Sequence, residues 1–329
     1  MYTLTDRFGR VIRDLRISVT DRCNFRCSYC MPAGYVPRPQ RDILSFEEIV
    51  RLVTLCLPLG VQKVRLSGGE PLVRRDTTDL VAGLARLPGL QDLAMTTNGH
   101  FLQAHLSRLH RAGLQRLNIS LDSLQRDRFH AMTGVDGLPT VLNAIEAASS
   151  EGFAPLKINC VAVRHQNEDE LVDFASFARK TGHTVRFIEF MPLDSARAWD
   201  RSLVVGGQEI LARIQSRYPL VRLPARQTGE TALRYGFADG NPGEIGIVAP
   251  VTMPFCGQCN RLRVTADGKI KTCLFSLQEH DIKTPMRSGA SDAELRALLM
   301  TIVMGKEKGH RINEPDFTPP ERTMSCIGG

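Results

Sequence analysis

Three cysteines stand within eight residues near the N-terminal end of the chain, at Cys23, Cys27 and Cys30. Short spacings of this kind let one loop surround an iron–sulfur cube, because cysteine thiolates are the ligands of its irons. A structural zinc ion takes four ligands, so these cysteines alone leave zinc one ligand short. On a four-iron cube, three thiolates leave one iron without a protein ligand, and that iron can bind a small molecule.

A second set of cysteines lies in the C-terminal part, at Cys256, Cys259 and Cys273. It predicts a second metal centre. A zinc ribbon completed by His280 or Cys326 is the structural alternative to a second iron–sulfur cluster. The chain has nine cysteines, an odd number, and in a reducing compartment such sets indicate metal sites in place of disulfides.

Two arginines follow the second set closely, Arg261 and Arg263. On a strand they project to the same face, away from Leu262. Their guanidinium groups repel each other unless an anion lies between them, and the planar donor fork of arginine suits phosphate. The pair therefore indicates an anionic ligand beside the second metal centre, and the alternative is a solvated stripe on the surface.

The elements that must position these residues alternate between strand and helix in the first two thirds of the chain. Predicted strands cover 14–19, 61–66, 90–96, 114–121, 156–163 and 185–190. Helix start signals stand between them: a capping box at 45–48, and caps at Asp76 and Asn167. This order indicates parallel strands with right-handed crossovers. We predict an α/β fold, an incomplete (βα)6 TIM-like barrel closed by a smaller C-terminal α+β extension.

Polar side chains alternate with apolar ones along several predicted strands. Leu15 and Ile17 share one face of the first strand and Arg16 lies on the other, and the same alternation places Arg65 and Lys157 opposite aliphatic neighbours. Burying so many polar groups without partners is costly. The sequence therefore predicts a ligand cavity inside the barrel.

The second predicted strand ends in a turn that contains Gly68, Gly69 and Glu70. Glycine permits close approach of the backbone, and a glutamate there can accept a hydrogen bond from an ammonium group. Ligands of such barrels lie at the C-terminal ends of the strands. Other residues predicted at these ends are Thr96, Asn98, Ser120, Asp122, Glu189 and Met191, and we expect them to share one cavity.

The pattern changes beyond residue 195. We predict a helix over 208–217, irregular chain through 254, a hairpin of strands 261–265 and 269–274, and a helix over 292–304. Two domains are expected: a partial-barrel core over 1–194 and a C-terminal region over 195–329.

The composition, 43% apolar and 23% charged residues among 329, is typical of a globular protein. No apolar run approaches the ~18 residues of a membrane-spanning helix, and the N-terminus lacks a hydrophobic signal region, so we expect a cytoplasmic protein. The net charge of +7 suggests an anionic partner without identifying it.

The chain resembles the GTP 3′,8-cyclases, a family of radical S-adenosylmethionine (SAM) enzymes in molybdenum cofactor biosynthesis. The resemblance covers nearly the whole chain. It rests on both cysteine sets, the segments 64–71, 96–99, 120–123 and 186–189, the arginine pair, and the terminal Gly328 and Gly329.

The resemblance implies two [4Fe–4S] clusters, SAM and GTP as ligands of specific residues, and assigns no catalytic acid or base. The first cluster would be held by Cys23, Cys27 and Cys30, and the second, whose open iron meets the guanine base, by Cys256, Cys259 and Cys273. SAM would contact Tyr29, Gly69, Ser120 and Met191. GTP would contact Arg16, Arg65, Thr96, Lys157, Arg261 and Arg263.

The resemblance also implies a reaction and partners. A 5′-deoxyadenosyl radical from SAM would remove hydrogen from C3′ of GTP, and the carbon radical would add to C8, giving (8S)-3′,8-cyclo-7,8-dihydroguanosine 5′-triphosphate. The implied partners are GTP, an electron donor protein of the flavodoxin or ferredoxin type, and the downstream cyclic pyranopterin monophosphate synthase. A homodimer is compatible with the family, and neither a membrane nor a nucleic acid is an expected partner.

Two other functions are alternatives. Another twin-cluster radical SAM enzyme, acting on a peptide or other substrate, would share the first cysteine set and the glycine turn, but it usually has more C-terminal cysteines and no arginine pair. A zinc-stabilised nucleic-acid-binding protein would hold zinc without sulfide and bind with strong salt dependence. That alternative leaves the inward polar strand faces unexplained.

Overall fold

The computed structural model describes residues 3–31, 34–193 and 199–327. The terminal Gly328 and Gly329, and the predicted domain boundary at 194/195, lie outside the described residues. Among the helices that are described, none combines the length and apolar character needed to cross a membrane.

The centre of the fold is a parallel sheet whose strands follow one another in chain order. These strands are β1 (Asp14–Ser18), β2 (Lys63–Ser67), β3 (Asp92–Thr97), β4 (Arg116–Ser120), β5 (Lys157–Ala162) and β6 (Thr184–Glu189). All six predicted strands are confirmed. Aliphatic residues such as Leu15 and Ile17 are fully buried on one face, as their alternation predicted.

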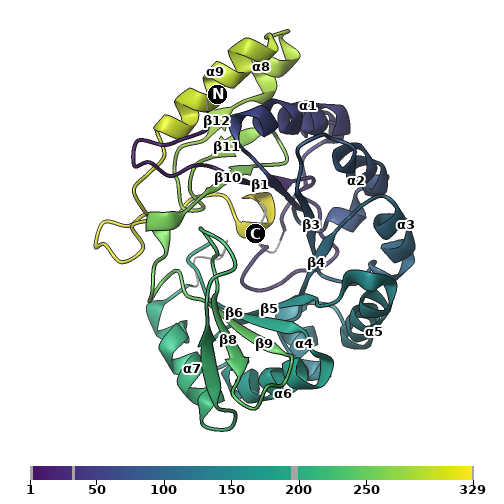
Figure 1. Cartoon of the computed structure of the whole chain (residues 1–329), viewed down its shortest axis with the longest axis vertical. Coiled ribbons are helices and arrows are strands. Elements are labelled where there is room, and N and C mark those ends of the chain that lie inside the picture. The colour runs from purple at the N-terminus through teal and green to yellow at the C-terminus, as the bar shows by residue number, and fades with distance from the viewer. Residues whose placement is uncertain (1–2, 32–33, 194–198, 328–329) are drawn as a thin grey trace.

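Helices cover the outer face of this curved sheet (Figure 1). They are α1 (Phe46–Cys56), α2 (Thr77–Ala85), α3 (Leu106–Arg111), α4 (Arg126–Thr133), α5 (Leu138–Ala148) and α6 (Leu171–Thr181). Short 3-10 helices lie at Gln40–Asp42, Leu57–Leu59, Pro71–Val73, Gln103–His105, Glu168–Glu170, Arg201–Leu203 and Cys256–Gln258, and a π-helical turn at Ser149–Phe153.

The predicted helix caps have different outcomes. The capping box is confirmed, because Ser45 and Glu48 exchange hydrogen bonds between side chain and backbone. Asp76 stands at the start of α2 but makes no side-chain cap bond. Asn167 was wrongly predicted as a cap: its amide donates to the carbonyls of Asp122 (2.7 Å) and Val161 (2.8 Å). The Asn167 side chain bonds these carbonyls and makes no hydrogen bond to the backbone of the helix that follows it.

The C-terminal region lengthens this sheet at both edges, in the order β12-β11-β10-β1-β2-β3-β4-β5-β6-β9-β8-β7. On one side β9 (Glu244–Val248) pairs parallel with β6, and β8 (Leu233–Phe237) and β7 (Leu220–Leu223) continue antiparallel. On the other, β10 (Arg261–Val264) pairs parallel with β1, followed by antiparallel β11 (Lys269–Lys271) and β12 (His280–Asp281). Within the described residues, the sheet stays open, as expected of an incomplete barrel.

Three of these strands, β7 to β9, correct the prediction of irregular chain through residue 254. Their sequences are short and interrupted by Gly236 and charged residues, so their strand character comes from pairing with β6 and with one another. The predicted hairpin is confirmed as β10 and β11.

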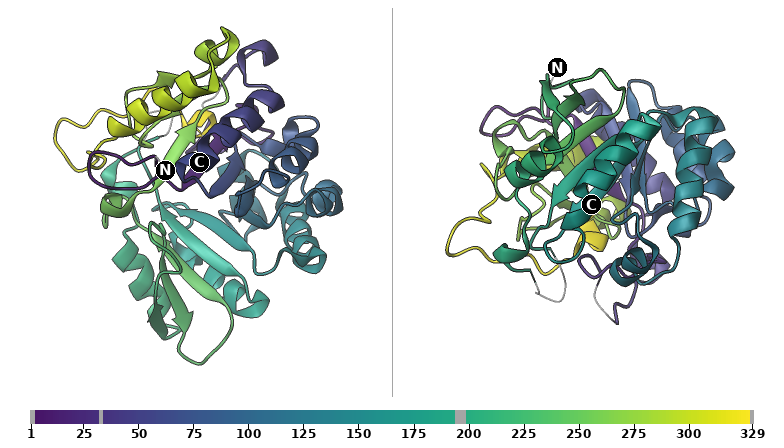
Figure 2. Two further views of the ribbon diagram at one scale, coloured as in Figure 1. Left: turned by 45° about the horizontal axis from the view of Figure 1, so that its top comes forward. Right: turned by 90° about the horizontal axis from the view of Figure 1, so that it is seen from below.

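The remaining helices are α7 (Gly207–Gln215), α8 (Lys283–Arg287), α9 (Asp292–Met304) and α10 (Met324–Ile327), which confirms the two helices predicted in this part. The helix α9 packs against α1 at the outside of the fold (Figures 1 and 2). The short α10 lies in the concave centre of the sheet (Figure 1), where Ile327 packs with Leu193, Val251 and Phe275. The C-terminal segment therefore forms part of the barrel interior.

Candidate functional site

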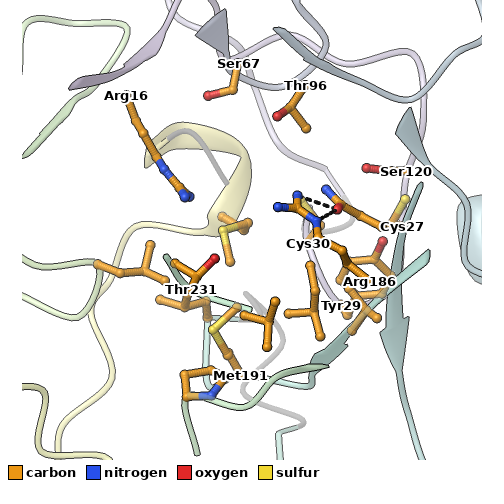
Figure 3. A pocket seen from close by; sticks show the side chains of 18 of the residues that line it. Arg16, Cys27, Tyr29, Cys30, Ser67, Thr96, Ser120, Arg186, Met191 and Thr231 are labelled. Atoms are coloured by element: carbon orange, nitrogen blue, oxygen red, sulfur yellow. Dashed lines mark hydrogen bonds between the residues drawn. The ribbon is translucent and has the colours of Figure 1, made fainter. Parts of the chain in front are cut away.

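A cavity of about 290 Å³ lies at the C-terminal ends of the parallel strands. All the predicted site residues except Lys157 line it, including both cysteine sets. Arg16, Thr96, Ser120, Tyr29 and Met191 surround the same space (Figure 3), although they come from distant parts of the chain. The fold therefore assembles the two predicted metal centres and the predicted ligand contacts around one cavity.

The first cysteine set lies in the loop after β1. Its three thiols are partly exposed and free of disulfides. Burial raises the pKa of Cys23 to about 11 and that of Cys30 to about 12, with the Cys23 and Cys326 thiols adding to the effect at Cys30. Binding of a cluster must therefore displace protons from these thiols.

The second cysteine set is assembled from two segments. Cys256 begins a short 3-10 helix and Cys259 follows it, with a hydrogen bond from the Cys259 backbone amide to the Cys256 carbonyl (3.0 Å), and Cys273 follows β11. Burial opposes ionisation of Cys259, but the positive charges of Arg261 and Lys306 outweigh it and lower the pKa of this thiol to about 6. This centre is electrostatically prepared for a thiolate ligand.

The cysteine sets fit clusters better than single ions. Across the described part of the chain, no three His, Cys, Asp or Glu side chains are arranged to chelate one metal ion. The Cys326 thiol in α10 interacts with Cys30 of the first set and donates to the Tyr35 hydroxyl (3.3 Å), so it does not complete a zinc ribbon at the second set. A cubane holds its thiolates at separate corners, which agrees with three cysteines spread around a cavity.

The glycine turn is held tightly against the start of the cysteine loop. The Gly69 amide donates to the Thr20 carbonyl (2.7 Å), and a Cβ on Gly69 would come within 2.2 Å of the Arg22 carbonyl oxygen. Only glycine fits there. Glu70 was expected as an acceptor for a ligand ammonium. Its carboxylate instead accepts from the Thr97 hydroxyl (2.8 Å) and from the backbone amide of Asn98 (2.7 Å). Burial raises the pKa of this carboxyl to about 7.

Other residues at the strand ends are partly occupied by protein contacts. The Tyr29 hydroxyl donates to Asp122 (2.5 Å), whose buried carboxyl also accepts from the Val161 amide (2.9 Å). The Thr96 hydroxyl accepts from Asn118 (3.2 Å). In contrast, the Ser67 hydroxyl is buried without a hydrogen-bond partner among the described residues. A buried polar atom of this kind is the signature of a site that binds a ligand.

Arginines concentrate in the interior. Arg261 and Arg263 both face the cavity from β10, beside Arg16 in the neighbouring β1, and this confirms the predicted common face. Burial and the charges of Arg263 and Arg65 lower the pKa of Arg16 well below its usual value, and burial together with Arg261 lowers that of Arg263 to about 10. The buried Nε atoms of Arg16 and Arg65 have no hydrogen-bond partner within the described ranges. An anion would relieve this repulsion.

Lys157 lies in a second, smaller cavity of about 50 Å³ at the N-terminal ends of the strands. Asp14, Lys63 and Arg116 also line it, each near the start of its strand. Burial and the charge of Arg186 lower the pKa of Lys157 to about 7. Because Arg16, Arg65 and Arg186 border both cavities, the two form opposite ends of one cationic interior.

Sequence reasoning did not place Arg186 in the site. Its guanidinium donates twice to the side-chain Oδ1 of Asn159 (2.9 and 2.6 Å; Figure 3), and burial and Arg65 lower its pKa to about 9. Its position between Val185 and Phe187 is the signal that could have found it, since alternation places it on the inner face. Thr231, Phe255, His310 and Met324 also line the main cavity. They come from segments without periodicity, so no such signal marks them.

Comparisons with known proteins agree with this geometry. The model of the Radical SAM superfamily matches residues 17–178, and that of Molybdenum Cofactor Synthesis C matches residues 183–312. A GTP 3′,8-cyclase of Xanthomonas axonopodis is 47% identical, covering 99% of both chains, and one of Rhodopirellula baltica is 46% identical, covering 99% of this chain and 92% of that one. Streptococcus suis SuiB bound to S-adenosylmethionine shares the fold at a TM-score of 0.65 and 13% identity, covering 97% of this chain and 79% of that chain.

Proposed function

The chain belongs to the GTP 3′,8-cyclase family of radical SAM enzymes, and from this we propose that it converts GTP to (8S)-3′,8-cyclo-7,8-dihydroguanosine 5′-triphosphate in molybdenum cofactor biosynthesis. As a member of this family it uses SAM and [4Fe–4S] clusters. The observation that carries the proposal is that one cavity is lined by both cysteine sets and by buried arginines.

We assign Cys23, Cys27 and Cys30 to the first cluster and Cys256, Cys259 and Cys273 to the second. When bound, SAM and the first cluster supply a 5′-deoxyadenosyl radical that can take a hydrogen atom from C3′ of the ribose. The SAM contacts that we propose are Tyr29, Gly69, Ser120 and Met191, which line the cavity. The partnerless Ser67 hydroxyl offers a further contact.

The cationic interior suits the triphosphate of GTP. We assign Arg16, Arg65, Arg261 and Arg263 to its binding, with Arg186 bordering the same space and Thr96 as a further GTP contact. The shared border of the two cavities lets the phosphate chain extend toward Lys157. Arginine donors hold phosphate in fixed directions, which keeps C3′ and C8 oriented for ring closure.

The surrounding protein limits side reactions. The apolar residues Leu193, Phe275 and Met324, the last of them from α10, line the cavity and pack in one cluster. Excluding water and competing hydrogen donors protects a reactive carbon radical until it adds to C8.

Several further assignments complete the proposal. The reduced thiols of both sets suit the cytosol. An electron donor of the flavodoxin or ferredoxin type would deliver the electron, a cyclic pyranopterin monophosphate synthase would consume the product, and a homodimer is compatible with these roles. The division into 1–194 and 195–329 remains a proposal, and one sheet passes through both parts.

The test begins with iron, acid-labile sulfide and zinc in protein that has been purified and reconstituted without oxygen. We expect about eight irons and eight sulfides per chain, as two four-iron cubanes require. Incubation with SAM, a reductant and GTP should then yield 5′-deoxyadenosine and the cyclised nucleotide. About four of each plus one zinc would make the second site structural and count against GTP as substrate. A full iron content without GTP turnover would favour a twin-cluster enzyme with another substrate.

A further inference from the structure

A buried lysine, Lys306, lies two residues beyond the end of α9 and close to the second cysteine set. Its side chain is almost fully buried, at 1% exposure. Its ammonium group donates to the Arg261 carbonyl (3.1 Å) and, over a short distance, to the Thr272 carbonyl. Arg261 stands two residues after Cys259, and Thr272 directly precedes Cys273, so one ammonium joins the two segments that carry these cysteines.

The residues that follow Lys306 contact the same segments. The Glu307 carboxylate accepts from the Thr272 hydroxyl (2.7 Å). Gly309 packs against Cys256, where an added Cβ would lie 3.1 Å from the Cys256 Cβ. The segment 306–309 thus reaches the surroundings of all three cysteines.

Arg10 supports this arrangement from the N-terminal part of the chain. Its guanidinium donates to the carbonyls of Cys256 (2.8 Å) and Lys308 (2.9 Å), and it is paired with Asp6 (2.6 Å). The charge of Arg10 is therefore balanced by a carboxylate. Lys306, in contrast, forms no ion pair with a carboxylate in the part of the chain that the structure describes.

An ammonium buried without a carboxylate is costly unless another negative charge lies near it. The charge of Lys306 interacts with both Cys259 and Cys273 when these are thiolates. Three thiolates on an oxidised [4Fe–4S] core, which carries two positive charges, leave one net negative charge at this centre, and reduction adds another. Lys306 supplies one positive charge beside this centre, which offsets the net charge of the oxidised form and half that of the reduced form.

We propose that Lys306 is a positioning residue of the second cluster: it holds the Cys259 and Cys273 segments in register and stabilises the reduced cluster by its charge. This inference rests on the proposed function, because it requires a second [4Fe–4S] cluster at this site. Residues outside the cluster shell commonly orient metal ligands and tune the metal in this way.

The test compares Lys306→Met, which keeps the shape and removes the charge, with Lys306→Arg, which keeps the charge. Lys283→Met is the matched control, because Lys283 also donates to a backbone carbonyl, but to that of Asp42, which stands next to no cysteine of either set. Each reconstituted holoenzyme is titrated potentiometrically and followed by electron paramagnetic resonance. The redox couple whose midpoint potential changes when SAM is added belongs to the first cluster. The other redox couple belongs to the second cluster.

We expect Lys306→Met to lower the equilibrium constant for reduction of the second cluster about tenfold, a shift of about 59 mV to more negative potential for one electron. Lys306→Arg and Lys283→Met should leave both couples near wild type. If Lys306→Met loses the second cluster while Lys306→Arg keeps it, the positioning role is supported. Two results would overturn the proposal that the charge of Lys306 stabilises the reduced cluster. One is an unchanged midpoint potential of the second cluster in Lys306→Met, and the other is loss of that cluster in both Lys306 variants.

The design separates this inference from the proposed function. Wild-type protein that carries about eight irons without converting GTP would defeat the proposed function while leaving the potentiometric comparison intact. Wild-type protein with only one cluster would defeat both.

Discussion

The two cysteine sites of this protein face the same cavity but are built in opposite ways. The first takes all three of its cysteines from one loop of eight residues, from Cys23 to Cys30. The second joins a turn at Cys256 and Cys259 to Cys273, and it depends on Lys306 and other residues far away in the chain.

Their electrostatic surroundings differ as much as their construction. Burial raises the pKa of the first thiols, and acidic neighbours such as Asp122 and Glu70 raise it further. Around Cys259, the charges of Arg261 and Lys306 lower the pKa in spite of burial. The acidic surroundings of the first site therefore favour a cationic ligand such as SAM. The basic surroundings of the second favour an anionic ligand such as a nucleoside triphosphate.

Removing one cysteine from each site should give the largest effect. Cys30→Ala should abolish cleavage of SAM, by about a thousandfold or more, because chemistry that depends on a cofactor disappears with it. Cys273→Ala should retain SAM cleavage and lose GTP cyclisation. Both are measured as 5′-deoxyadenosine and cyclised nucleotide, with iron content as the control, and each variant should keep about four irons. Loss of SAM cleavage in Cys273→Ala with the first cluster intact would contradict this division.

Thiol reactivity in the metal-free protein should reveal the electrostatic difference directly. At pH 7 a thiol with a pKa of about 6 is mostly thiolate, whereas one with a pKa of about 11 is thiolate in roughly one molecule in ten thousand. Since thiolates of low pKa are weaker nucleophiles, we expect iodoacetamide to label Cys259 about a hundredfold faster than Cys23. Peptide mass spectrometry over time measures both. Equal labelling rates at Cys259 and Cys23 would contradict the difference in thiol pKa between the two sites.

Replacing Arg263 by Ala should weaken GTP binding about tenfold or more, since a charge-assisted hydrogen bond contributes about 1.5–3 kcal/mol. Arg261→Ala should act in the same direction. Both clusters should remain, because neither side chain is a ligand. Arg126→Ala, which removes an exposed arginine paired with Asp136, is the matched control. Equilibrium binding of GTP measures the effect. Wild-type affinity for GTP in the Arg263 variant would show that Arg263 does not bind the triphosphate.

Lys157 should give GTP binding a moderate pH dependence. Its pKa of about 7 in the free protein is far below the usual value, so it loses its proton as the pH rises through 7. A bound triphosphate favours the charged form and raises this pKa. Binding therefore takes up a proton above pH 7, and affinity should fall by up to about tenfold per pH unit.

Calorimetry at pH 7 to 9, in buffers with different ionisation enthalpies, detects this proton uptake. Lys157→Met should bind more weakly at pH 7 and lose most of the pH dependence. If the GTP affinity of that variant fell with pH as steeply as in the wild type, another group would take up the proton.

Much of the barrel could be predicted because its signals are local. The six parallel strands alternate regularly, and the capping box before α1 lies within four residues. The strands β7 to β9 were missed because their partners, not their residues, make them strands. Asn167 was wrongly predicted for a similar reason: one of its acceptors is the Asp122 carbonyl, 45 residues earlier in the chain, which only the fold brings near.

For the site, the sequence by itself determined the candidate residues: both cysteine sets, the arginine pair, the glycine turn and the inward polar faces of the strands. These follow from residue type and spacing, which do not depend on distant parts of the chain. Only the tertiary structure decided that both cysteine sets share one cavity, that Lys157 lines a second cavity at the N-terminal ends of the strands, and that Lys306 joins the segments of Cys259 and Cys273. Contacts between residues far apart in the chain exist only after folding, and they set the burial and charge that tune each site.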